Sequence, residues 1–302
     1  MKVFNLSILA GLIGVPAMGC DLCSLYNATE ASTGVGQGFY AGAAEQFTRF
    51  GTLQRDGRQI PNDGVFINSS VSQVFAGYNF TYRFGVQFNL PVIYRAFGSA
   101  TARGTESGPG DGSLIGNVRL YEKLGENVTF SWAALGGIKF PTGNPGRLGG
   151  PDFSEGIGGH DLALGSGSFD GIVGTSFLTR WKHLFMTAAA QYAIRSKGAF
   201  HHQYANDLTW AGGPGMYLAL HHNYTLALQA VVSGETKGKD TLSGLPDGDS
   251  AETIVYLGPQ INFTWSSKLS AQLGADVPMS IANSGVQVVP DYRVRAGVSW
   301  RF

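Results

Sequence analysis

Two cysteines near the start of the chain, Cys20 and Cys23, form a Cys-x-x-Cys pair, and the sequence has no others. In an oxidising compartment such a pair commonly forms a local disulfide. Two further interpretations stay open: acylation of Cys20, and metal or redox contact of the pair with a periplasmic partner. Two thiolates supply only half of a tetrahedral zinc shell, and the six histidines show no spacing that would complete it. The pair is therefore a candidate for disulfide, lipid or metal chemistry.

Catalytic chemistry has one candidate region, a predicted loop that holds carboxylates and a histidine. Its residues are Asp152, Glu155, His160 and Asp161. A hydrolase would need a nucleophile and a base that converge there, and no serine motif accompanies the group. The pairs His201-His202 and His221-His222 are expected at interfaces or in solvent, because adjacent strand or turn side chains diverge. We therefore predict that the protein is not an enzyme and uses no cofactor.

Arginines at alternate positions near the end of the chain form a third group, and they need a strand to position them. In residues 291–302, apolar and aromatic residues occupy one side of a period-two pattern. These are Tyr292, Val294, Ala296, Val298, Trp300 and Phe302, and the other side carries Arg293, Arg295 and Arg301. An aromatic last residue on such a strand resembles the terminal strand of bacterial outer-membrane barrels, where it is part of the signal for the insertion machinery.

The composition and the first residues restrict the class of protein. Only 14% of the 302 residues are charged, whereas a soluble protein usually carries roughly a quarter. Lys+Arg equals Asp+Glu, which argues against a nucleic-acid partner. Lys2, an apolar run, and small residues at Ala17 and Gly19 predict a signal peptide over residues 1–19. No later segment has 18 uninterrupted apolar residues. An exported chain of this kind is periplasmic, secreted or an outer-membrane barrel.

Alternation of apolar and polar residues recurs along the rest of the chain. In the clearest example, seven apolar residues alternate from Tyr82 to Tyr94, with aromatic residues at both ends, as expected where a strand crosses two membrane interfaces. Twelve such strands are predicted, at about 38–50, 66–80, 82–94, 114–121, 128–140, 168–179, 184–194, 207–221, 224–232, 250–264, 269–277 and 291–302. The pattern indicates an all-β protein.

Connections of two lengths alternate between these strands. Short ones fall near 80–81, 123–127, 180–183, 221–223 and 266–267, and long ones fall at about 51–65, 96–111, 141–167, 196–206, 235–249 and 279–289. Bacterial outer-membrane barrels place short turns in the periplasm and long loops outside. We therefore predict a transmembrane antiparallel up-and-down β-barrel over residues 37–302, with both termini periplasmic. Residues 20–36 are expected to form a periplasmic segment or plug.

Three glycine-rich motifs carry a specific resemblance. Gly110-Asp111-Gly112-Ser113-Leu114 opens one strand, Gly137-Ile138-Lys139-Phe140-Pro141-Thr142-Gly143 closes the next, and Leu164-Gly165-Ser166-Gly167-Ser168-Phe169-Asp170 begins another. This stretch resembles the outer-membrane transporter family named for the meta-pathway of phenol degradation. The resemblance implies an outer-membrane barrel of the Gram-negative type and passage of aromatic or other apolar compounds. The motifs themselves have a structural interpretation, since Pro141 ends a ladder and the glycines allow tight turns.

Charged residues on the polar faces are expected to point into the lumen or toward its rim. The basic ones are Arg83, Arg119, Lys139, Arg195, Arg293, Arg295 and Arg301, and the acidic ones are Glu45, Glu252 and Asp276. Either they select solutes in a cationic lumen, or they pair with one another and avoid lipid. Twelve strands lie between a packed eight-stranded barrel and an aqueous sixteen-stranded porin, so the lumen should be narrow.

Two functions follow from this architecture. The first is a passive outer-membrane channel, in which the N-terminal segment and the long loops gate a narrow cationic lumen for small solutes. The alternative is a barrel that acts as sheath or anchor for a periplasmic redox or metal-handling partner, bound through Cys20 and Cys23.

Overall fold

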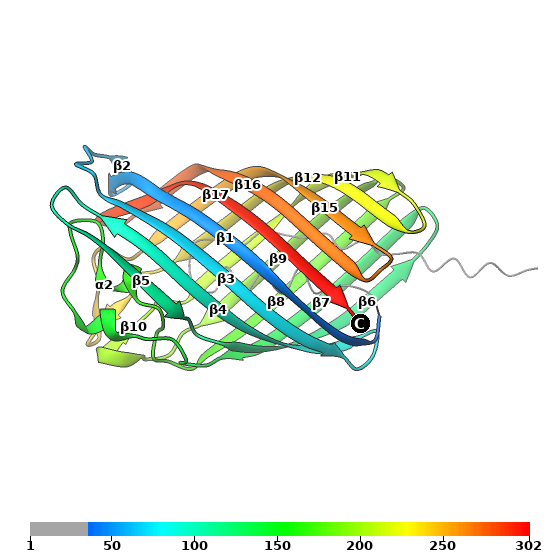
Figure 1. Cartoon of the computed structure of the whole chain (residues 1–302), viewed down its shortest axis with the longest axis horizontal. Coiled ribbons are helices and arrows are strands. Elements are labelled where there is room, and N and C mark those ends of the chain that lie inside the picture. The colour runs from blue at the N-terminus through cyan, green and yellow to red at the C-terminus, as the bar shows by residue number, and fades with distance from the viewer. Residues whose placement is uncertain (1–35) are drawn as a thin grey trace, which may run out of the picture.

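Twelve long antiparallel strands close into a barrel in the computed structural model, which describes residues 36–302 (Figure 1). They are β1 (Gly38–Arg55), β3 (Phe66–Asn79), β4 (Phe84–Gly98), β6 (Ser113–Leu124), β7 (Val128–Lys139), β8 (Asp170–Trp181), β9 (Leu184–Ile194), β11 (Asp207–Leu220), β12 (Tyr224–Lys237), β15 (Glu252–Trp265), β16 (Leu269–Asn283) and β17 (Val286–Arg301). Each pairs with its neighbours along the chain, and β17 pairs with β1 to close the sheet. The predicted fold class is confirmed.

Eight short elements lie in the connections between these strands. They are β2 (Arg58–Gln59), β5 (Arg103–Pro109), β10 (His202–Gln203), β13 (Thr241–Leu242), β14 (Leu245–Pro246), η1 (Gly146–Gly149), α2 (Gly159–Leu162) and η2 (Ala199–His201). All belong to the long loops, so one end of the barrel carries most of the irregular structure (Figure 1). Tyr40 of β1 pairs with Arg301 of β17, which places both barrel termini at the other, short-turn end.

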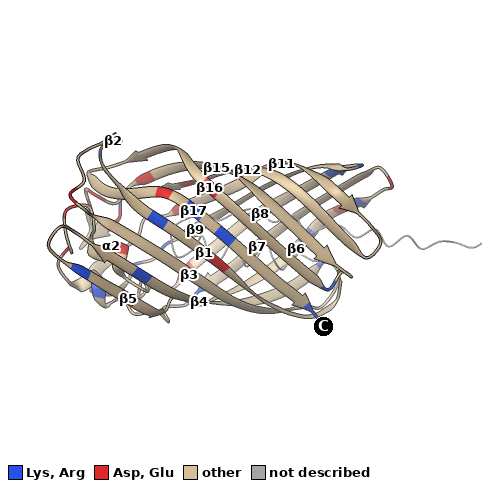
Figure 2. Ribbon diagram, turned by 45° about the horizontal axis from the view of Figure 1, so that its top comes forward, with Lys and Arg blue, Asp and Glu red and all other residues tan. Residues whose placement is uncertain are grey.

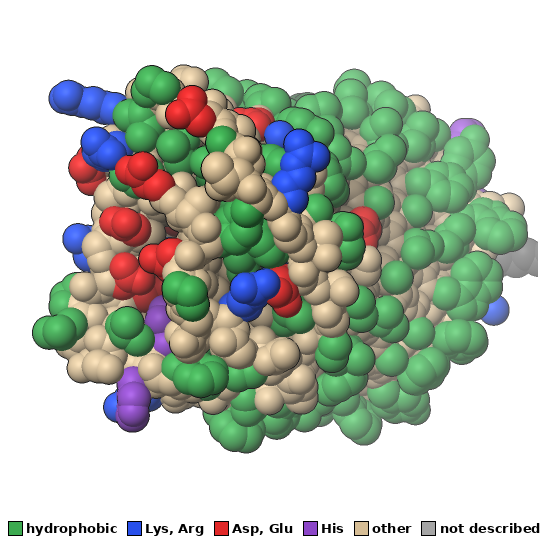
Figure 3. All heavy atoms as spheres, turned by 60° about the vertical axis from the view of Figure 1, so that its left-hand side comes forward, with side chains coloured by type: hydrophobic (Ala, Val, Ile, Leu, Met, Phe, Trp, Pro, Cys, Tyr) green, Lys and Arg blue, Asp and Glu red, His purple; other side chains and the backbone are tan. Residues whose placement is uncertain are grey.

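Alternation along each strand sorts side chains between the outer wall and the interior. On β4, Phe84 and Phe88 are exposed, whereas Gln87 and Asn89 are buried inside. A barrel closed in this way leaves no unpaired sheet edge in lipid. Figure 3 shows apolar side chains covering the wall and charged side chains gathering at the loop end. The apolar positions of the period-two pattern therefore lie on the outer wall and the polar positions lie in the interior, as the sequence predicted.

Glu45 is the exception to the predicted facing. Its neighbours on β1, Ala44 and Gln46, are both buried in the interior, so Glu45 lies on the outer face. The expectation that it points into the lumen is wrong, because Phe39 and Phe47 do share its face.

The last of the predicted long loops, at 279–289, is a two-residue turn. Strands β16 and β17 run on to Asn283 and Val286, and Ser284 with Gly285, whose φ is 61°, connects them. Pairing between the two strands nevertheless ends at Asp276 and Arg293. Proline has no N–H to donate to a ladder, and Pro278 follows closely on β16. Beyond this point β16 pairs with β15, and β17 pairs with β1.

Candidate functional site in the barrel interior

The loop between β7 and β8 folds into the mouth of the barrel. Its residues Ile157 and Leu162 are buried in an apolar cluster with Leu53, Ile67 and Phe97 of the surrounding strands. Burial of two such aliphatic side chains contributes roughly 3–6 kcal/mol before ordering costs. The loop is therefore packed against the inner side of the strands at the loop end of the barrel.

Polar contacts tie the same loop to β4, to β5 and to the connection between β9 and β11. Arg95 of β4 donates from Nη1 to the carbonyl oxygen of Ala163 at 2.6 Å. The Tyr204 hydroxyl donates to the carbonyl oxygen of His160 at 3.1 Å. At the outer rim Arg147 pairs with Glu106, although rim pairs of this kind contribute at most about 1 kcal/mol. The buried Arg95 contact is thus the strongest single tether.

The substitution Arg95→Met should loosen the loop, while the methionine side chain still fills the space that the arginine side chain occupies beside β4. A lost hydrogen bond from a charged group weakens docking by about 1.5–3 kcal/mol. Limited proteolysis within residues 145–163 should become faster, while Arg103→Met on the exposed part of β5 serves as the control. Equal cleavage rates in the two variants would rule out the tether.

The three glycine-rich motifs meet at a buried polar network beneath this loop. Asp111 accepts hydrogen bonds from the backbone N–H of Gly143 and of Ser166, both at 2.9 Å. Lys139 lies 2.6 Å from an Asp111 oxygen and 2.8 Å from an Asp170 oxygen. Thr142 accepts from the N–H of Gly112 at 2.7 Å. The motifs are therefore structural: they fix the two ends of the loop to the barrel.

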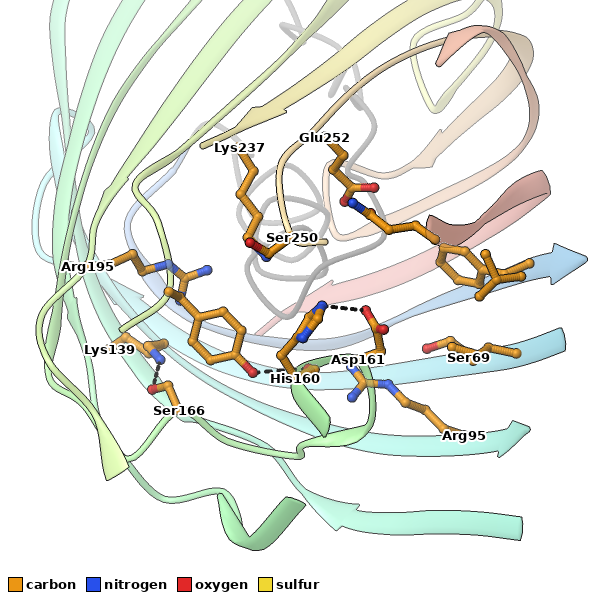
Figure 4. A pocket seen from close by; sticks show the side chains of 15 residues that line it. Ser69, Arg95, Lys139, His160, Asp161, Ser166, Arg195, Lys237, Ser250 and Glu252 are labelled. Carbon is orange, nitrogen blue, oxygen red and sulfur yellow. Dashed lines mark hydrogen bonds and ion pairs between the residues drawn. The ribbon is translucent and has the colours of Figure 1, made fainter. Parts of the chain in front are cut away.

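A cavity of about 100 Å³ lies beside the loop at the same end of the barrel (Figure 4). Its lining combines apolar residues with charged ones from six different segments. They are Phe50, Ile67, Ser69, Arg95, Lys139, His160, Asp161, Ser166, Arg195, Tyr204, Lys237, Ser250, Glu252, Gln287 and Val288. The structure thus brings together three residues of the predicted solute path, Lys139, Arg195 and Glu252.

Basic side chains outnumber acidic ones in the lining of this cavity. The basic residues are Arg95, Lys139, Arg195 and Lys237, and the acidic ones are Asp161 and Glu252. Further carboxylates lie behind the cations: Arg195 is 3.1 Å from Asp170, and Lys237 is 3.1 Å from Asp240. These acids offset the cost of burying the cations. They also hold the cationic side chains in place.

His202 of β10 belongs to the same end of the barrel and is buried rather than solvated. Its ring stacks on that of His160 at 6.3 Å between centroids, and Tyr204 packs edge-on at 4.7 Å. Neither ring nitrogen has a hydrogen-bond partner, and Nε2 lies 3.7 Å from Asp240. Burial lowers the pKa of His202 from its usual value, Asp240 and Asp247 oppose that shift, and His160 and Lys237 add to it. The expectation that both members of His201-His202 lie at an interface or in solvent is wrong for His202, which is buried.

Acid should therefore weaken the loop structure around His202. Because its pKa is lower in the folded protein, the unfolded loop binds the proton more readily, and the stabilisation falls as the pH drops below about 6.5. His202→Phe keeps an aromatic ring against His160 and Tyr204 but cannot titrate. Proteolysis of residues 195–206 should accelerate between pH 7.5 and 5.5 in the wild type and less in the variant. The same acid sensitivity in both proteins would contradict this role.

A second charged cluster lies further along the interior, between β16 and β17. Asp276 accepts hydrogen bonds from Arg293, at 2.8 Å from Nη2, and from Arg295, at 2.8 Å from Nε. Arg295 also donates to Gln260 at 2.9 Å, and Arg293 lies 4.2 Å over the ring of Tyr256. Both arginines are almost fully buried. This cluster joins the two strands where their backbone pairing ends.

The remaining predicted lumen cations, Arg83, Arg119 and Arg301, lie toward the short-turn end, away from both clusters. Arg83 is exposed in the turn before β4, with its guanidinium 5.4 Å from the ring of Tyr82. Arg119, in the middle of β6, pairs with Glu122 at 2.9 Å, and its backbone N–H donates to the carbonyl oxygen of Arg83 at 2.8 Å. Arg83 lies at the rim, whereas the side chain of Arg119 is mostly buried. The structure does not place Arg119 with Arg295 in a common site.

Buried charges of both signs occur in the interior of the barrel. Among the residues described, the buried cations are Arg95, Lys139, Arg180, Arg293 and Arg295, and the buried acids are Asp111, Asp170, Asp207, Glu235, Asp240 and Asp276. Figure 2 shows how few charged residues the strands carry elsewhere. The sequence missed several of these acids because they lie at strand ends and in loops.

Two carboxylates of the candidate catalytic group stabilise the conformation of the loop that contains them. Asp161 accepts the N–H of Gly158 at 2.8 Å, and Asp152 accepts that of Gly159 at 3.1 Å, so both stabilise the first turn of α2. Within residues 36–302, no cluster of three or more metal-ligating side chains has the geometry to hold an ion. No helix in that range is long and apolar enough to cross a membrane. Cys20, Cys23 and the predicted signal peptide lie outside the described residues.

Comparison with known proteins supports the fold. The barrel resembles an outer-membrane channel from Pseudomonas putida F1, with a TM-score of 0.67 and 16% identity over 88% of this chain and 96% of that one. The autotransporter β domain of Bordetella Brka aligns with a TM-score of 0.45 and 11% identity, over 87% of this chain and 99% of that chain. No protein-family model and no curated protein matches the sequence. The chain therefore has the fold of an outer-membrane β-barrel.

Proposed function

We propose that the protein is a passive outer-membrane channel for small solutes. The observation that carries this proposal is the contrast between an apolar outer wall and an interior lined by buried polar side chains. A path for solutes across the membrane requires a polar interior of this kind. The loop-end cavity supplies an entrance. The short-turn end, with both barrel termini, faces the periplasm in this arrangement.

The cavity lining supports a class of solute. Phe50, Ile67 and Val288 offer an apolar surface, while Arg95 and Lys237 belong to the basic part of the lining. We infer that small aromatic or largely apolar compounds pass, and that those bearing an anionic group pass most readily. The resemblance of the glycine-rich motifs to an outer-membrane transporter family agrees with this choice. Residues 20–36 are proposed as a further gate on the periplasmic side.

Uptake into liposomes tests both parts of the proposal. Benzenesulfonate and phenyltrimethylammonium are similar in size, opposite in charge, and cross lipid slowly. Vesicles containing the purified protein should admit benzenesulfonate faster. Equal rates, or faster entry of the cation, would refute the anion preference alone. Entry of neither compound, both with the full chain and after removal of residues 20–36, would refute the channel.

A further inference from the structure

Glu252 supplies one of the two carboxylates that line the loop-end cavity. It is the first residue of β15, and in the ladder it pairs with Lys237 of β12 on one side and Asn283 of β16 on the other. Asn283 ends β16 beside the turn at the loop end, so Glu252 lies beyond the membrane-spanning part of the strands. Figure 4 shows its side chain directed into the cavity, on the side away from Lys139.

Most of the other charged side chains in this lining are held by fixed partners. Buried aspartates lie against three of the cations, Lys139, Arg195 and Lys237. The second carboxylate, Asp161, accepts the backbone N–H of Gly158. Within residues 36–302, by contrast, no hydrogen bond and no close ion pair reaches the carboxylate of Glu252. This carboxylate is therefore available to act on a solute in the cavity.

The surroundings of Glu252 set the pH range in which it carries a charge. Its side chain is partly buried, and the loss of contact with water is the largest cause that raises its pKa. Asp161 of the β7–β8 loop and Asp207 of β11 raise this pKa further, whereas Lys237 and His160 lower it. The balance raises the pKa of Glu252 to about 7. An ordinary glutamate is fully ionised at neutral pH, but Glu252 gains and loses its proton there.

We propose that Glu252 is the residue that determines the charge selectivity of the loop-end cavity. This inference rests on the proposed channel function and adds the residue that sets its preference. When Glu252 is ionised, its negative charge repels an anionic group on a solute and attracts a cationic one. When it is protonated, the basic side chains of the lining act on the solute without this opposition. The preference for anionic solutes is therefore weaker at about pH 8.5 than at about pH 5.5.

Calorimetric titration of the purified full chain with benzenesulfonate tests this role. Glu252→Gln keeps the size of the side chain and removes its charge, so at about pH 8.5 the variant should bind benzenesulfonate about fivefold more tightly than the wild type. At about pH 5.5 the two affinities should agree, because the wild-type carboxyl group is then protonated. Glu126→Gln, in the exposed short turn between β6 and β7, is the matched control and should bind as the wild type does at both pH values.

Proton uptake on binding is a second measurement, one that a merely structural role of Glu252 would not change. Titrations at about pH 7.5 in two buffers of different ionisation enthalpy should show that the wild type takes up protons with benzenesulfonate. Glu252→Gln should lose most of this uptake, and any remainder belongs to His160 and His202. Equal affinities at about pH 8.5, or equal proton uptake, in the wild type and Glu252→Gln would overturn this inference alone. If no variant binds benzenesulfonate, the proposed solute class is wrong as well.

Discussion

Substitution of Asp276 by Asn should destabilise the barrel by about 3–5 kcal/mol, the cost of leaving a buried charge without its partner. Two arginines depend on this carboxylate, since Arg293 and Arg295 both donate to it inside the barrel. The cost should be large because the cluster joins β16 and β17 where their ladder ends. Urea unfolding followed by tryptophan fluorescence measures the change in free energy.

Two further variants separate this effect from a general loss of charge. Arg119→Gln removes a single ion pair toward the short-turn end, with side chains 15% and 16% exposed, and should cost less than Asp276→Asn because only one partner loses its contact. Adding Arg295→Gln to Asp276→Asn removes one of the two arginines that lost their carboxylate partner, and should recover part of the lost stability. If Asp276→Asn were no more damaging than Arg119→Gln, the cluster would not be a structural element of the barrel.

Removal of residues 145–163 should raise the single-channel conductance several-fold. These residues include η1, α2 and the apolar side chains that lie in the mouth. The excision is geometrically mild, because the N–H groups of Leu164 and Gly165 both donate to the carbonyl oxygen of Asn144 at 3.1 Å. The Asp111 network, which involves Gly143 and Ser166, is retained. Planar bilayer recording of the wild type and the deletion gives the comparison.

A point substitution checks the same conclusion without shortening the chain. Leu162→Asp places a charge at a buried position and should release the loop from the wall, since an unpaired buried charge is unfavourable. The same substitution at Leu245, which is 72% exposed on another loop, should leave the conductance unchanged. A conductance that stays constant in both the deletion and Leu162→Asp would mean that the loop does not limit the flow of ions.

Strand alternation made most of the fold predictable from the sequence. A residue such as Phe88 must meet lipid if Gln87 meets the interior, so each regular strand also assigns its own facing. Alternation predicted the wrong face for Glu45, where a polar residue occurs on the apolar side of the strand. It was also wrong for 279–289, because strands that leave the membrane no longer need a regular apolar face.

The candidate site was less predictable because loops build it. Lys139 and Glu252 lie in predicted strands and Arg195 directly follows one, and the three do share one cavity. Insertion of the β7–β8 loop depends on isolated apolar residues, Ile157 and Leu162, which have no periodicity in the sequence. Burial of His202 depends on a loop that folds back on His160. Only three-dimensional contacts between distant loops reveal these features.

Single-channel recording of the purified full chain in a planar bilayer tests the central claim most directly. A polar interior with a loop in its mouth should give discrete, small current steps. The contrary result is a folded barrel that gives no steps, whether the full chain is used, residues 20–36 are removed, or residues 145–163 are excised.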